Sequence, residues 1–156
     1  MILLALAALL CAADEDALTV TLTFERMHCD ECKAELEASV KKMQGFKGVS
    51  FLGSAVLLLF DEKQPVPAFN RLPKDLSLRA VTLAIRGTVS FAGEKGTLVA
   101  RSGSTYALVN GEKSKADPLG DLKKKLGGKN RFTVTGALGD PKTIALASFQ
   151  AADWKD

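Results

Sequence analysis

The residues best suited to chemistry in this chain are two cysteines close together in the sequence. Cys29 and Cys32 lie in the stretch MHCDEC, which covers residues 27–32. A thiolate is both a soft metal ligand and a nucleophile, and two thiols three positions apart can act on the same metal ion or join as a disulfide. The spacing therefore predicts a soft-metal site or a redox pair.

The periodicity of the flanking residues predicts which elements position this pair. Apolar and polar residues alternate over 18–25, which is typical of a half-buried strand. Leu36, Val40 and Met43 then recur at helical spacing. We therefore expect the cysteines in the loop that leaves a strand and in the first turn of a helix. Free amide groups and the helix dipole favour thiolate at such a position.

The ligands available near the pair favour an open two-sulfur site. A structural zinc site needs four ligands, whereas this chain has one histidine and no second cysteine pair. We expect Cu(I) as the bound ion, with Zn(II) as an alternative. Met27 and His28 are the supporting residues: the thioether is expected to fill a gap in the core, and the imidazole is a candidate third ligand.

Two alternatives to metal binding use the same cysteines. The pair could cycle between dithiol and disulfide, or it could form a static disulfide in an interaction module. Hydrolytic catalysis is not expected, because the chain has no HExxH motif, no Gly-rich phosphate loop and only one histidine. We therefore expect a binding protein and no enzyme.

The first thirteen residues, MILLALAALLCAA, are apolar and uncharged, and an acidic run follows them. This run is shorter than the about 20 residues that span a bilayer, and it resembles a secretory signal that ends at small residues. We predict a signal peptide over 1–13 and a periplasmic or secreted protein without a transmembrane segment in its mature chain. Cleavage is favoured over a lipid anchor at Cys11.

The 156 residues have a formal net charge of +3, which is unevenly distributed. Acidic side chains are in excess up to about residue 78, and basic side chains are in excess after it. Such a difference favours two units with different surfaces. The sequence therefore predicts two small domains after the signal, over 14–80 and 81–156.

The first domain reads as strand, helix, strand, strand, short helix and strand. Residues 46–51 and 55–60 are the middle strands, and prolines bracket a short helix within 66–72. This order predicts a ferredoxin-like βαββαβ domain.

A resemblance to a known family supports the same fold. Met27, Cys29 and Cys32 in the spacing MxCxxC, followed by Leu36, Glu37, Val40, Met43, Gly45, Phe46, Val49 and Phe51, resemble the heavy-metal-associated domain. That family includes copper chaperones and a periplasmic mercury carrier. The resemblance implies that Cys29 and Cys32 are the metal ligands and that Met27 packs beneath their loop. It also implies Hg(II) as a further candidate ion and a protein partner for metal transfer.

The second domain reads as three strands, a helix and two strands. The strands are predicted at 82–91, 97–101, 105–109, 131–135 and 143–149, and the helix at 117–128, with Asp117 as its N-cap. This order predicts a small OB-type β-barrel, so the fold class is α+β. Nucleic-acid binding is not expected, because export removes most nucleic acid from reach and single basic faces are common. We expect the aromatic rings to fill a small core instead of stacking on bases.

Overall fold

The computed structural model describes residues 17–112, 115–139 and 142–155. The predicted signal peptide at 1–13, with Cys11, lies outside the described residues. Within these ranges no helix is long and apolar enough to cross a membrane.

Strands are the main type of secondary structure in the described chain. They are β1 (Ala17–Phe24), β2 (Phe46–Leu52), β3 (Ala55–Asp61), β4 (Leu78–Ala92), β5 (Lys95–Ala100), β6 (Thr105–Asn110), β7 (Arg131–Leu138) and β8 (Thr143–Ala151). The helical elements are α2 (Asp30–Val40), α3 (Pro118–Lys125) and the 3-10 turns η2 (Phe69–Arg71) and η3 (Lys74–Leu76).

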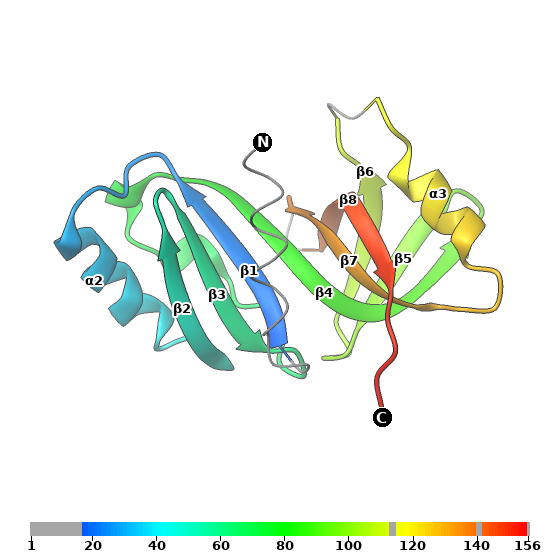
Figure 1. The fold of residues 1–156 in the computed structure, drawn as a ribbon, viewed down its shortest axis with the longest axis horizontal. Coiled ribbons are helices and arrows are strands. Elements are labelled where there is room, and N and C mark those ends of the chain that lie inside the picture. Colours follow the sequence, from blue (N-terminus) through cyan, green and yellow to red (C-terminus); the bar gives the residue numbers. More distant parts are fainter. Residues whose placement is uncertain (1–16, 113–114, 140–141, 156) are drawn as a thin grey trace.

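All eight strands belong to one sheet, in the order β2-β3-β1-β4-β5-β6-β8-β7, and β7 also pairs with β4. The last pairing closes β4, β5, β6, β8 and β7 into a five-stranded barrel (Figure 1). The long strand β4 belongs to two halves of the sheet: the half that carries the cysteines, with β1, β2 and β3, and the barrel half, with β5 to β8. Its first part pairs with β1, from Leu78 opposite Phe24 to Ala84 opposite Thr19, and its last part pairs with β5.

Two glycines allow strands of the barrel to approach closely. A Cβ atom on Gly87 of β4 would collide with the backbone oxygen of Val99, and one on Gly136 of β7 would collide with that of Ala145. Glycine is found in strands where another backbone comes this near. These two positions therefore let β4 and β7 curve into the closed barrel.

The core follows the alternation of the strands. Val20 and Leu22 of β1 and Leu58 of β3 are fully buried, and α2 covers this part of the sheet with Leu36 and Val40. Apolar area removed from water stabilises a fold by about 25 cal/mol per Å². The same burial fixes the register of β1, because a slip of one residue would expose its whole apolar face.

The predicted fold class, a ferredoxin-like βαββαβ domain followed by an OB-type barrel, is wrong. The chain is mostly β, with a closed five-stranded barrel and only two α-helices among the described residues. The second helix expected in the first unit is absent there. Pro65, Pro67 and Pro73 remove backbone donors and clash with the preceding turn, so only the three-residue turns η2 and η3 form.

The strands expected in two separate domains form one continuous sheet. The predicted boundary between residues 80 and 81 lies inside β4, which runs unbroken through Leu78–Ala92. An alternating apolar pattern shows where a strand lies but does not show that one strand serves two halves of a molecule.

Candidate functional site

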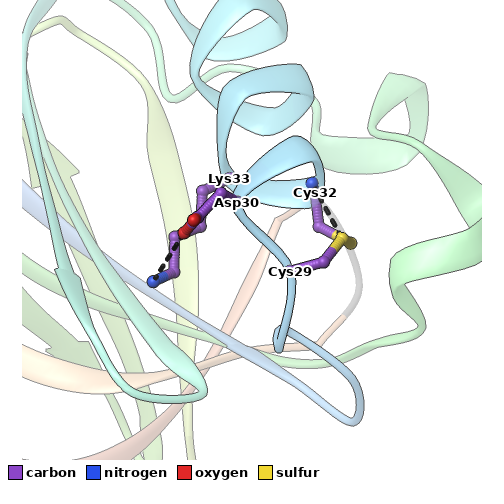
Figure 2. The surroundings of a disulfide bond; sticks show 4 residues. All are labelled: Cys29, Asp30, Cys32 and Lys33. Carbon is purple, nitrogen blue, oxygen red and sulfur yellow. Dashed lines mark hydrogen bonds and ion pairs between the residues drawn. A yellow bond between two sulfur atoms is a disulfide. The ribbon is translucent and has the colours of Figure 1, made fainter.

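Cys29 and Cys32 form a disulfide at the start of α2 (Figure 2). Cys29 is the N-cap residue, with extended backbone angles (φ −112°, ψ 148°), and Cys32 lies in the first turn of the helix. The backbone N–H of Cys32 donates a hydrogen bond to Sγ of Cys29 over 3.1 Å. The sulfur of Cys29 therefore takes the capping position that an oxygen of Ser, Asp or Asn takes in most helices.

The loop before the helix is held at its beginning by backbone hydrogen bonds. The N–H of Phe24 donates to the carbonyl of Ser54, and the N–H of Glu25 donates to the carbonyl of Ser77, each over 3.0 Å. The Met27 side chain then enters the core and is 3% exposed. These contacts fix the chain on the inner side, so that His28 and Cys29 lie at the surface.

The electrostatic surroundings of the pair combine two opposing effects. The N–H of Cys32 and the positive end of the helix dipole favour negative charge on Cys29 when the disulfide is reduced. Asp30 and Glu31 in the first turn oppose it with their own negative charges. Lys33 lies 3.9 Å from a carboxylate oxygen of Asp30 and offsets part of that charge. A soft cation between the sulfurs would relieve the remaining repulsion.

The four predicted site residues lie in different environments in the structure. Cys29 and Cys32 are brought together, Met27 is buried beneath the loop, and His28 is exposed. Among the described residues there is no group of three or more His, Cys, Asp or Glu side chains that could hold a metal ion. The described part of the chain thus offers no site with three or more such ligands. Describing the first unit as a ferredoxin-like heavy-metal-associated domain is wrong, because its strands belong to one eight-stranded sheet of a mostly β fold.

The sequence analysis gave no role to a second group of polar residues, which we name the Glu62 cluster. It consists of Glu62, Arg86, Arg101, Arg131 and Trp154. One signal for it was available, because the acidic Glu62 directly follows the apolar strand β3. Nothing in the sequence showed that these distant residues meet.

Comparisons with family models, with curated proteins and with solved structures find no match for this chain. The chemistry of the cysteine pair is therefore argued from its geometry.

Proposed function

We propose that the reduced Cys29–Cys32 pair binds one soft metal ion, with Cu(I) as the first candidate and Zn(II) or Hg(II) as alternatives, and passes it to a partner protein. The observation that supports this proposal is the pairing of two sulfurs at the amino terminus of α2, one on the exposed Cys29 and one on the half-buried Cys32. Both thiols lose their protons when they bind a metal, so affinity falls as the pH is lowered.

The number of ligands supports Cu(I) over Zn(II). Thiolates select Cu(I), whereas zinc takes four ligands in its structural sites and three protein ligands in its catalytic sites. Two cysteines lie together here, without a third His, Cys, Asp or Glu grouped with them in the described residues. An exposed site with few ligands also leaves room for a thiolate of the partner, which allows transfer by stepwise ligand exchange.

A metal titration tests this proposal. The protein carries Cys11→Ser, so that Cys29 and Cys32 are its only thiols. After reduction, Cu(I) is titrated against a colorimetric Cu(I) chelator, with Zn(II) as competitor. We expect one-to-one binding that is lost when Cys29→Ser and Cys32→Ser are added. Binding of equal strength in that variant would contradict the proposal.

The disulfide itself favours a second function, thiol–disulfide exchange. A partner dithiol would attack one sulfur of the Cys29–Cys32 bond and become a disulfide, while this pair takes up two electrons and two protons. Equilibration with glutathione buffers measures the reduction potential. A value between about −270 and −120 mV, the range of dedicated thiol oxidoreductases, supports this function. A lower potential favours a static disulfide.

A further inference from the structure

The Glu62 cluster begins with a buried charge. The Glu62 side chain is only 1% exposed, and it lies directly after β3. Arg86 of β4 donates from Nε to Oε2 over 2.8 Å and from Nη2 to Oε1 over 2.6 Å. Nη1 of Arg101, which follows β5, donates to the same Oε1 over 2.6 Å. Burying a carboxylate is costly unless such bonds compensate it, so its ion pairs depend on well-held arginines.

The carboxyl-terminal segment Ala152–Lys155 lies over these arginines. The Trp154 ring centroid is 4.9 Å from Cζ of Arg131, 5.4 Å from that of Arg101 and 5.9 Å from that of Arg86. Contacts of this kind between a guanidinium and an aromatic face are favourable, and more so when water is excluded. One indole ring therefore contacts guanidinium groups from three separate segments.

Hydrogen bonds to its backbone also hold this segment, which is neither helix nor strand. Nη1 of Arg131 donates to the carbonyl of Trp154 over 2.8 Å, and Nη2 of Arg101 donates to that of Lys155 over 3.4 Å. The N–H of Ala152 donates to the carbonyl of Arg131 over 3.0 Å. After β8 the chain continues as a segment without regular structure (Figure 1), and these hydrogen bonds fix that segment to Arg101 and Arg131.

We propose that Ala152–Lys155 is a strap that holds the barrel against the sheet carrying the cysteines. Glu62 comes from the cysteine-bearing half, whereas the arginines and Trp154 belong to the barrel half. Arg86 and Arg101 contact both Glu62 and Trp154, so each contact holds these two side chains in the geometry that the other requires. Release of the strap loosens the ion pairs of Glu62, and loss of the Glu62 charge loosens the strap, because coupling between two sites is reciprocal.

Trp154 is the only tryptophan of the chain, so its fluorescence reports on the strap directly. We expect Glu62→Gln in the full chain to shift the emission to longer wavelength and to increase quenching by acrylamide. Glu94→Gln is the matched control, because it removes a 91% exposed carboxylate that pairs with Lys123. Emission and quenching of Glu62→Gln equal to those of the control would overturn the proposal.

Hydrogen exchange tests the coupling from Trp154 to the cysteine-bearing half. Trp154 lies outside every strand, so its substitution leaves the strands themselves unchanged. Trp154→Ala is expected to speed amide exchange over residues 55–62, in the cysteine-bearing half, and Trp154→Phe, which keeps an aromatic face, is expected to restore much of the protection. Faster exchange confined to the barrel would show that the segment stabilises the barrel alone.

A double-mutant cycle separates coupling from two independent losses. Glu62→Gln, Trp154→Ala and the double variant are unfolded in urea and followed by circular dichroism. Each single variant raises the unfolding equilibrium constant by some factor. We expect the factor for the double variant to be smaller than the product of the two single factors, by about twofold or more. Additive effects contradict the strap.

Discussion

The Cys29–Cys32 pair and the Glu62 cluster differ in how far apart their members lie in the sequence and in how much water reaches them. The cysteines are three positions apart, with Cys29 exposed and Cys32 half-buried, and one helix turn sets their geometry. Glu62 meets Arg101 across 39 positions, and its carboxylate is 1% exposed. Solvent therefore reaches Cys29 of the pair, whereas the cluster keeps its carboxylate away from water.

The difference in burial leads to the largest expected effect. Arg86→Ala removes the bidentate partner of a buried carboxylate and is expected to lower the free energy of unfolding by about 3 kcal/mol, the lower end for breaking a buried pair. Urea unfolding measures this change. Arg79→Ala is the control, since the side chains of Arg79 and Glu25 are 63% and 49% exposed and such pairs contribute about 0–1 kcal/mol. Equal losses in the two variants would remove the contrast between buried and exposed charge.

The next largest loss of stability is expected at Gly87, where the backbones of β4 and β5 come close together beside the Glu62 cluster. Gly87→Ala adds a Cβ that collides with the backbone oxygen of Val99, so β4 and β5 must separate next to Arg86. Overpacking of this kind costs about 1–3 kcal/mol, measured by thermal or urea unfolding. At Gly48 of β2 the nearest neighbour of a new Cβ is 4.0 Å away, and Gly48→Ala is expected to change stability far less. A neutral Gly87→Ala would show that the strands have room to adjust.

Reduction of the disulfide is expected to have a smaller effect. Closing so short a loop restricts the unfolded chain little, and loop-entropy arithmetic gives about 2 kcal/mol as the upper value for Cys29–Cys32. The comparison is between oxidised and reduced protein with Cys11→Ser, unfolded in urea. A loss greater than that of Arg86→Ala would mean that the disulfide is a structural staple, contrary to a role in exchange.

The smallest expected effect on stability is that of Asp117, the N-cap of helix α3. The backbone N–H of Gly120, together with the Asn110 amide, lowers the pKa of Asp117, the N-cap of α3. Because the pKa is lower in the folded state, this contribution is fully present above the ordinary pKa and is lost as the pH falls through the folded value. Stability of the parent protein should therefore decline more steeply on acidification than that of Asp117→Asn. Parallel pH profiles would contradict this assignment.

Local structure was predictable where neighbouring residues determine it. The strand expected over 18–25 is present as β1, and the cysteines lie at the helix start as predicted. Asp117 is the N-cap of α3, also as predicted. In each case a periodic pattern or a capping residue acts over one or two turns. The sequence therefore located both the candidate site and the elements that present it.

The local pattern did not anticipate two features of the fold. A short helix is expected within 66–72, but the prolines at 65, 67 and 73 allow only the turns η2 and η3. The expected boundary at 80/81 falls within β4, which pairs with β1 in its first part and with β5 in its last part. Strand pairing of this kind depends on residues far away in the chain, which no local pattern contains.

By itself, the sequence determined that two thiols stand together at the start of a helix, since three positions of spacing and a helical turn suffice for that. Only the tertiary structure decided that Glu62, Arg86, Arg101, Arg131 and Trp154 would meet. The physical reason is the range of the interactions. Backbone capping acts within a turn, whereas a buried ion pair needs a closed sheet to exclude water and bring its charges together.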